Sequence, residues 1–346
     1  MLKTCDIRIV FGKPNAIYAV GEEVTGTLHL TPHRSLRPTG LRLELFWRTH
    51  GRGNRASAKL VRYDLEVPSQ LEPDRTYRVP FHFLAPAGPL TYHGHLLNVD
   101  WYVRAVLGVP ALPGMLEPKE KTELLLLPRA GVSVDLGSKY KPPQKYAVTG
   151  GGVRWFLVLF GAVFGGVGLL FFILMLGQLF ALLPLLFVLV GVLFIFLGIR
   201  NALAVQRLGE VTFSVSPKEL IPGDTLLCQV RFTPLARLKL ERLRLTLKAQ
   251  EKVVRGSGTD KKTYRHTVFE EVRSALSERE LDVNEPVEVQ EAFQIPLDAP
   301  YTFVADDNAL LWSLDALIDV QGVLDWQHDA PLTVRSWHEG DTTIIG

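Results

Sequence analysis

The sequence has few features that carry chemistry. Its 346 residues include only two cysteines, Cys5 and Cys228, and no Cys-x-x-Cys pair. A disulfide framework or a cysteine metal site is therefore not indicated. Two cysteines far apart in strand-like runs predict free core thiols and a reducing compartment, with a single bridge between them as the alternative. The formal net charge of +2 is too small to indicate a nucleic-acid partner.

Catalytic and cofactor signatures are also lacking. His93-Gly94-His95 has no neighbouring ligands that would complete a metal site, and Gly150-Gly151-Gly152 lacks the Gly-Lys-Ser/Thr that closes a phosphate loop. The pairs His328-Asp329 and His338-Glu339 have no nucleophile or paired carboxylates beside them. We therefore predict no enzyme, no metal and no cofactor. The first residues contain no long apolar stretch, so no signal peptide is expected.

One long stretch has no charged side chain. Residues 155–199 are apolar and are interrupted near the middle by Gly177-Gln178. Each half, 155–176 and 179–199, has the ~20 residues needed to cross ~30 Å of hydrocarbon. Because a backbone in lipid must satisfy its own hydrogen bonds, each half is predicted to be an α-helix. The pattern predicts a two-helix transmembrane hairpin over 154–200, and the alternative is a helix pair buried inside a protein core.

The charges that flank this stretch predict its orientation. Lysine and arginine stay on the cytoplasmic side of an inserted hairpin. They lie before the first helix and after the second, whereas the turn carries no charge; the cations are Lys139, Lys141, Lys145, Arg154, Arg200 and Arg207. The chain is therefore predicted to be a multi-pass integral membrane protein with both termini cytoplasmic, in the plasma or inner membrane if it is bacterial.

Glycines give the first predicted helix a small-residue face. Gly161, Gly165 and Gly168 recur at helical spacing, and such a face lets another helix approach closely. We expect it to contact the second helix of the same hairpin. The alternative is contact with another protein or with a second copy of the chain, which would make a homo-oligomer.

The two flanks repeat one another. Gly21-Glu22 and Gly223-Asp224 lie 202 residues apart, and Leu41–Leu45 matches Leu243–Leu247 at the same offset. Apolar and polar residues alternate between these anchors, which predicts strands with one buried face. Short strands separated by Gly and Pro turns are typical of β-sandwiches.

A second match lies further along, in a shifted register. It aligns Val99–Ala105 with Leu314–Val320. Two repeats of ~130 residues are each long enough to bury a core. We predict the following boundaries: sandwich 1 over 1–130, a linker over 131–153, the hairpin over 154–200, sandwich 2 over 208–337 and a tail over 338–346.

These residues resemble a known family. Val20–Gly26 resembles the opening turn of arrestin-like domains, and Leu90–Gly94 followed by Val99–Ala105 resembles their later strand. Pro222–Asp224 and Ser313–Val320 repeat the two features. Arrestins, the retromer arrestin-like subunit and bacterial sporulation-control proteins share such a tandem. The resemblance implies a mainly β fold and a non-enzymatic binding module.

The chain also departs from that family. Arrestins join their sandwiches by a short linker, whereas this chain has the apolar hairpin there. No arrestin-style tail with adaptor motifs and no PPxY motif is present. Receptor desensitisation is therefore not implied.

Both repeats carry a basic loop after the Leu-Arg-Leu strand. The cations are Arg48, Arg52, Arg55 and Lys59 in the first loop, and Lys252, Arg255, Lys261, Lys262 and Arg265 in the second. Because the offset of 202 relates them, the loops are predicted to be equivalent. They are candidate contacts for anionic lipid headgroups or for an acidic or phosphorylated partner. The alternative is a pair of solvated hairpin tips.

Together these patterns predict a membrane-anchored adaptor or scaffold. Its partners would be the lipid bilayer and an unidentified cytoplasmic protein recruited by the sandwiches. The alternative is an accessory subunit of a larger membrane transport or secretion complex, packed through the hairpin. A membrane-bound enzyme is a third hypothesis, and it would need a pocket of converging polar residues.

Overall fold

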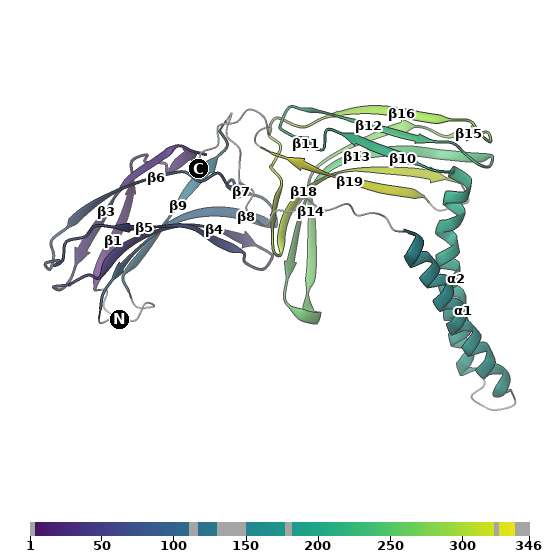
Figure 1. Cartoon of the computed structure of the whole chain (residues 1–346), viewed down its shortest axis with the longest axis horizontal. Helices are drawn as coiled ribbons and strands as arrows, with labels where there is room; N and C mark the ends of the chain where they lie inside the picture. The colour runs from purple at the N-terminus through teal and green to yellow at the C-terminus, as the bar shows by residue number, and fades with distance from the viewer. Residues whose placement is uncertain (1–3, 111–116, 130–149, 177–181, 322–324, 336–346) are drawn as a thin grey trace.

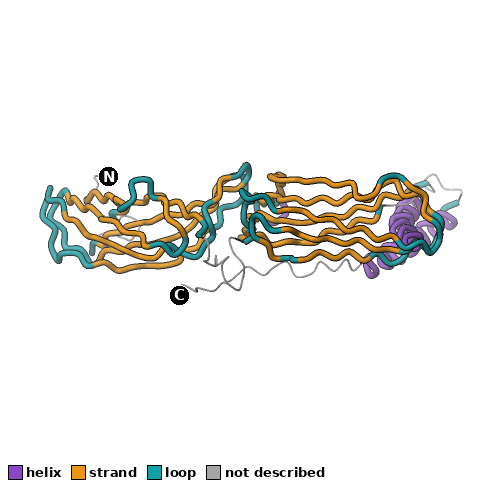
Figure 2. The backbone as a smooth tube through the Cα atoms, turned by 90° about the horizontal axis from the view of Figure 1, so that it is seen from above, coloured by secondary structure: helices purple, strands orange, loops and turns teal. Residues whose placement is uncertain are grey.

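The computed structural model describes residues 4–110, 117–129, 150–176, 182–321 and 325–335; within the helices, the side chains of 150–155, 157 and 197–206 are also outside the description. The chain is mainly β, with two β-sheet domains and two helices between them in sequence. The domains lie end to end, and the helices project from the end of the second domain that is farther from the first (Figure 1). The view from above shows the same end-to-end order (Figure 2).

Sandwich 1 is built from strands β1 to β9. Its smaller sheet has the order β1-β3-β6, and its larger sheet has the order β2-β9-β8-β4-β5 with β7 added to β8. The alternation of apolar and polar residues determines which face of each strand is buried. In β1, every second side chain from Cys5 to Phe11 is buried. The bounds are β1 Cys5–Phe11, β2 Ile17–Ala19, β3 Glu23–Pro32, β4 Gly40–Gly51, β5 Ser57–Leu65, β6 Tyr77–Leu84, β7 Tyr92–His93, β8 Leu97–Gly108 and β9 Lys119–Leu127.

Sandwich 2 repeats this plan with strands β10 to β19. Its sheets have the orders β10-β12-β16 and β11-β19-β18-β13-β14, with β15 and β17 added to the larger one. The bounds are β10 Thr212–Ser216, β11 Glu219–Leu220, β12 Thr225–Phe232, β13 Leu238–Arg255, β14 Lys262–Leu276, β15 Arg279–Leu281, β16 Val287–Gln294, β17 Phe303–Ala305, β18 Asn308–Val320 and β19 Trp326–Val334; the short 3-10 helix η1, Gly258–Asp260, lies between β13 and β14.

The two sandwiches share details beyond strand order. In each, a short second strand pairs in parallel with the last strand. The indole Nε1 of Trp101 donates to the carbonyl oxygen of Pro89 at 2.6 Å, and that of Trp312 donates to Pro300 at 2.8 Å. Both tryptophans are buried in their cores. This shared architecture agrees with a duplicated unit.

The structure corrects the register of the second match. Trp101 pairs with Trp47, and Trp312 pairs with Ala249, which lies 202 residues after Trp47. Trp312 is therefore the counterpart of Trp101, whereas the predicted alignment placed Ala316 there. Because side chains alternate with a period of two, a shift by an even number of residues keeps the same face inward and is invisible to the pattern.

The two cysteines are free, and each is buried. Cys5 lies in β1 of sandwich 1 and Cys228 in β12 of sandwich 2, so the alternative of a bridge between them is wrong. Burial raises the pKa of each thiol to about 11. Both thiols are therefore protonated and slow to react near neutral pH.

The helices form a hairpin whose ends differ from the predicted ones. The first, α1, spans Gly150–Leu174, and the second, α2, spans Leu183–Leu208. The glycine triplet Gly150-Gly151-Gly152 at the start of α1 is helical. Helix α2 runs past the predicted end at 199, because a helix needs good backbone geometry and not an apolar surface to continue. It stops before Gly209, which has a φ of +74° and is a favourable residue after a helix end.

Helix α2 continues directly into sandwich 2. Leu208 is buried in the core of that sandwich. The amide of Leu235 donates to the carbonyl oxygen of Arg207 at 2.9 Å. The predicted linker over 131–153, the turn Gly177-Gln178 and the tail over 338–346 lie largely or wholly outside the described residues.

Small residues bring the two helices together. A Cβ added at Gly161 would lie 2.6 Å from the carbonyl oxygen of Gly191, and one at Gly168 would lie 2.7 Å from the Cβ of Phe187. The backbone of Gly165 also faces Gly191. The glycine face of α1 is thus occupied by α2, as expected for a hairpin contact.

Among the described residues, no helix combines the length and the apolar character that a membrane crossing requires. The transmembrane part of the predicted fold is thus not supported by the described helices. The coarser prediction, a mainly β chain with two helices between two β-sheet domains, is confirmed.

Candidate functional site

The two sandwiches meet through a shared hydrophobic cluster. Sandwich 1 contributes residues from the start of β8 and the position just before it, and sandwich 2 contributes residues from β13, β17 and β18; the buried members are Leu96, Leu97, Val99, Val253, Phe303 and Leu310. The ring of Trp47 packs edge-on against Phe303, with 5.7 Å between centroids. Because both domains contribute buried side chains to this cluster, it favours a fixed arrangement of the two sandwiches.

A buried carboxylate lies beside this cluster. Glu251 of β13 is 0% exposed, and its oxygens accept hydrogen bonds from the Tyr92 hydroxyl at 2.9 Å and from the amides of His95 and Leu96 at 3.1 and 2.7 Å. A Cβ at Gly94 would collide with the same carboxylate. Burial and the neighbouring Glu251 hold the pKa of Tyr92 well above its usual range. All three donors belong to the other sandwich, so the carboxylate links the two domains.

Asn54 provides a second polar link. Its side-chain amide donates to the carbonyl oxygen of Gly256 and to Asp307, both at 2.8 Å, and its oxygen accepts from the amide of Gly256 at 3.1 Å. The Asn308 side chain donates to the carbonyl oxygen of Asn54 at 2.7 Å. Asn54 and Gly256 are separated by 202 residues, so equivalent positions of the repeat contact each other across the interface.

Most cations of the first basic loop contact either the interface with sandwich 2 or residues of sandwich 1. The Arg52 guanidinium lies 4.1 Å from the ring centroid of Tyr264 in sandwich 2. Lys59 forms an ion pair with Glu44, and the Arg48 guanidinium lies 5.8 Å from the ring centroid of Phe46. Arg55 is exposed.

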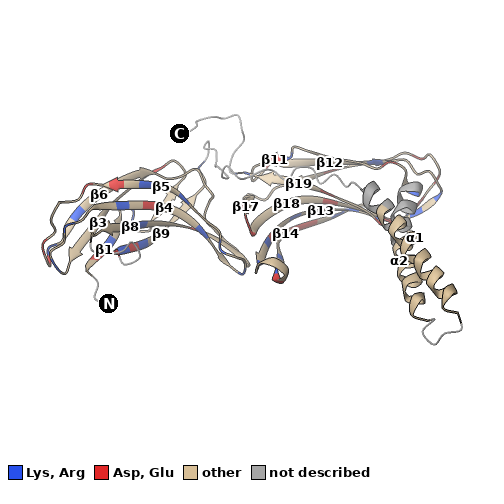
Figure 3. Cartoon of the chain, turned by 60° about the horizontal axis from the view of Figure 1, so that its bottom comes forward, with Lys and Arg blue, Asp and Glu red and all other residues tan. Residues whose placement is uncertain are grey.

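The second basic loop is arranged differently. Arg255, Lys261 and Lys262 are exposed around η1 at the tip of the β13–β14 hairpin. Lys252 and Arg265 are paired across the two strands and line a groove. Figure 3 shows this tip projecting from sandwich 2. The two loops occupy equivalent strand connections. Gly256 of the second loop contacts Asn54 of sandwich 1, whereas its cations Arg255, Lys261 and Lys262 are exposed.

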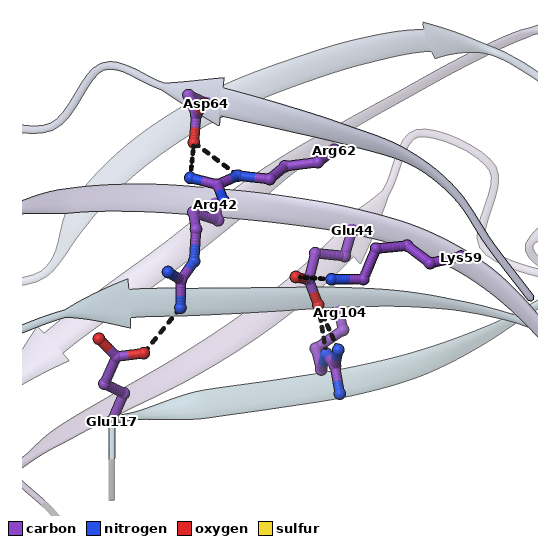
Figure 4. Close-up of polar contacts among 7 residues, drawn as sticks. All are labelled: Arg42, Glu44, Lys59, Arg62, Asp64, Arg104 and Glu117. Atoms are coloured by element: carbon purple, nitrogen blue, oxygen red, sulfur yellow. Dashed lines mark hydrogen bonds and ion pairs between the residues drawn. The ribbon is translucent and has the colours of Figure 1, made fainter. Parts of the chain in front are cut away.

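The outer face of the larger sheet in sandwich 1 carries a network of ion pairs (Figure 4). Glu44 is only 6% exposed and accepts from Lys59 and from the Arg104 Nε, the latter at 2.7 Å. Burial alone would raise the pKa of Glu44, but the hydrogen bonds from Lys59 and Arg104 outweigh it and the pKa is lowered. Arg42 bonds Glu117 at 2.7 Å. The cations on this face are therefore largely neutralised within the sandwich.

Aromatic rings extend the same face. Tyr102 stacks on Phe46 at 5.4 Å, and the Lys121 ammonium lies 3.8 Å from its ring centroid. The Tyr102 hydroxyl lies 2.8 Å from the His50 Nε2. Burial, together with the charges of Glu123 and Asp100, raises the pKa of Tyr102 to about 12. The hydroxyl stays protonated at neutral pH and can act as a hydrogen-bond donor.

A groove of about 680 Å³ lies on the larger sheet of sandwich 2. Lys252 and Arg265 line it together with Asp306, Asp307 and Asp329. Charges of both signs around a concave strand surface suit an extended peptide better than a small apolar ligand. In the described part of the chain, no group of three or more His, Cys, Asp or Glu residues is placed to hold a metal ion.

Glu251 and Asn54 were not among the residues predicted from the sequence. One signal was available for Glu251: it occupies the inward register of β13, between the buried Ala249 and Val253. A charged residue at an inward position indicates a buried polar contact. Asn54 carries no comparable local signal.

Comparisons with known proteins add little to this geometry. No family model matches the chain, and no curated protein matches it. Among solved structures, it is similar to the sporulation control protein Spo0M from Bacillus subtilis, with 16% identity and a TM-score of 0.30 over 36% of this chain and 48% of that protein. The chain thus spans about half the length of Spo0M. A likeness at this TM-score carries no argument about family or function.

Proposed function

We propose that this chain is a membrane-anchored, non-enzymatic adaptor or scaffold that presents two coupled sandwiches to a cytoplasmic protein partner. The observation that carries the proposal is the surface of the helical hairpin. Its described side chains include large apolar groups that are mostly exposed, such as Leu159 at 66%, Leu174 at 67% and Leu189 at 66%. Leaving such a side chain in water forgoes about 1.5–3 kcal/mol of burial, so a cover of lipid is favoured.

The sequence extends this surface beyond the described residues. The uncharged run spans 155–199 and includes the connection between the helices, whereas the absence of a membrane span applies to the described part alone. Lysine and arginine on both flanks of the run favour a cytoplasmic position for both sandwiches. The hairpin would then anchor the tandem from one side.

Two features of the sandwiches support the proposed binding of a protein partner. Glu251 and Asn54 couple them through hydrogen bonds across the interface. The groove lined by Lys252 and Arg265 offers a surface for an extended segment of a partner. Anchoring such a surface raises the effective concentration of partners at the membrane.

The runner-up function is an accessory subunit of a membrane transport or secretion complex. In that case a larger protein, and not lipid, would cover the apolar side chains. The contact would not use Gly161, Gly165 and Gly168, because α2 already occupies that face.

Alkaline carbonate extraction tests the proposal. We expect the full chain to stay in the membrane pellet, and the double variant Leu170→Arg and Leu189→Arg to be released or degraded. Each arginine raises the cost of insertion by about 2.5–3.5 kcal/mol. Leu227→Arg with Leu297→Arg is the matched control on sandwich 2, where both side chains are exposed, and it should behave like the wild type.

Release of the wild-type chain by carbonate would contradict the anchor. Retention in the pellet, with migration as a large assembly in mild detergent, would favour the runner-up function.

A further inference from the structure

The β13–β14 hairpin is the longest in the molecule's described part. Its strands have 18 and 15 residues, against 12 and 9 in the equivalent hairpin β4–β5. The last pair of β13 and β14 is Arg255 and Lys262. Beyond it, Gly256 and Gly258 adopt positive φ angles of 93° and 58°, which glycine adopts without strain and which close the tip tightly.

The tip has an excess of positive charge. Arg255, Lys261, Lys262 and Arg265 are exposed, against one exposed carboxylate, Asp260. Within the described residues none of these four cations forms an ion pair, whereas Lys59 of the equivalent loop is paired with Glu44. Four unpaired cations on a narrow hairpin form a site for an anionic surface.

The direction of the tip indicates what it faces. The tip and the α1–α2 hairpin project from the same side of sandwich 2 in Figure 1, and they do so again in Figure 3, which is turned by 60°. An anionic surface at the base of the helical hairpin would therefore lie on the side toward which the tip points.

We propose that the β13–β14 tip binds the anionic headgroups of the leaflet in which the helical hairpin is anchored. The inference rests on the proposed membrane anchor. Each Lys or Arg near such a surface strengthens attachment by about fivefold. The helical hairpin and the tip then form two separate attachments, which fix the rotation of the tandem about the helices and so set the orientation of the groove beside Lys252 and Arg265.

A fluorescent label at the tip tests this directly. The full chain carrying Ser257→Cys is labelled with an environment-sensitive dye; Cys5 and Cys228 are buried and react slowly. It is then reconstituted into vesicles of phosphatidylcholine alone or of phosphatidylcholine with phosphatidylglycerol. We expect the dye to shift to the blue, and to be quenched by headgroup-labelled lipids, only in the anionic vesicles. High salt should reverse the shift without detaching the protein.

Charge variants provide the controls. Lys261→Glu with Lys262→Glu should weaken tip binding about twenty-five-fold or more, because two cations are lost, while the chain still floats with the vesicles. Arg78→Glu with Lys218→Glu changes the net charge equally at exposed positions outside the tip and should leave the dye shift unchanged.

The outcomes separate the two proposals. A chain that fails to float with either kind of vesicle contradicts the membrane anchor. A chain that floats with both, but whose dye is indifferent to phosphatidylglycerol, contradicts the lipid contact alone. A dye that responds to a phosphorylated peptide and not to anionic vesicles would also overturn the inference, because the tip would then serve a protein partner.

Discussion

Replacement of Glu251 by alanine is expected to uncouple the two sandwiches. The carboxylate accepts hydrogen bonds from Tyr92, His95 and Leu96, all in the other domain. Glu251→Ala would leave the buried amide of Leu96 and the partly buried amide of His95 without an acceptor, and leaving a buried donor unsatisfied costs about 1–3 kcal/mol. We expect the free energy of opening the interface to fall by about 3 kcal/mol, and each sandwich to stay folded on its own core.

Hydrogen exchange at the amides of His95 and Leu96 measures this effect. A loss of about 3 kcal/mol corresponds to about a hundredfold faster exchange. Glu251→Gln keeps an acceptor and should give an intermediate rate. The control is Glu280→Ala, which removes an exposed carboxylate paired with Arg237 in the same sandwich. Unchanged exchange in Glu251→Ala would show that the hydrophobic cluster alone holds the domains together.

Replacement of Gly191 by leucine is expected to separate the helices. A Cβ at this position would lie 2.5 Å from the Cα of Gly165 and 2.7 Å from the carbonyl oxygen of Gly161. Both are backbone atoms, so no side-chain rotation can relieve the collision. Overpacking of this kind costs about 1–3 kcal/mol or more. Gly166→Leu is the matched control, because an added Cβ there meets nothing within 4 Å.

Disulfide cross-linking reports the distance between the helices. The ring centroids of Phe160 and Phe194 lie 5.3 Å apart, so a Phe160→Cys and Phe194→Cys pair places one thiol on each of the two facing helix surfaces, where the rate of cross-linking can be followed. We expect Gly191→Leu to slow that cross-link about tenfold or more, and Gly166→Leu to leave it unchanged. Equal rates in all three backgrounds would mean that the helices do not pack through this face.

Alternation along the strands predicted most of the β architecture. A period of two tells which side chains lie inside, as in β1 and β18, because each strand has one buried face. It does not tell the register between repeats, since an even shift preserves the pattern, and for this reason Trp101 was matched to Ala316 in place of Trp312.

The sequence predicted the surroundings of the two basic loops less well than it predicted the strands. Local sequence relates both loops by the offset of 202, and they do occupy equivalent hairpins. Their surroundings differ, because the Arg52 guanidinium packs on the ring of Tyr264 in the other domain, whereas Lys261 and Lys262 are exposed. Such contacts depend on how two domains dock, and a single sequence carries no periodic signal for that.

The end of helix α2 also could not be predicted from the hydropathy pattern. Loss of apolar character after residue 199 suggested an end, but α2 continues to Leu208, where a buried side chain and the positive φ of Gly209 end it. A backbone feature and a tertiary contact thus decided the boundary, and hydropathy did not.

Cysteine accessibility in intact cells tests the central claim, a hairpin in the membrane with both sandwiches on its cytoplasmic side. Cys5 and Cys228 are buried and give little background. A membrane-impermeant maleimide should label a Gln178→Cys variant from outside, and a Ser257→Cys variant only after the cells are permeabilised. Labelling of the Ser257→Cys variant in intact cells, or protection of the Gln178→Cys variant until permeabilisation, would contradict the account.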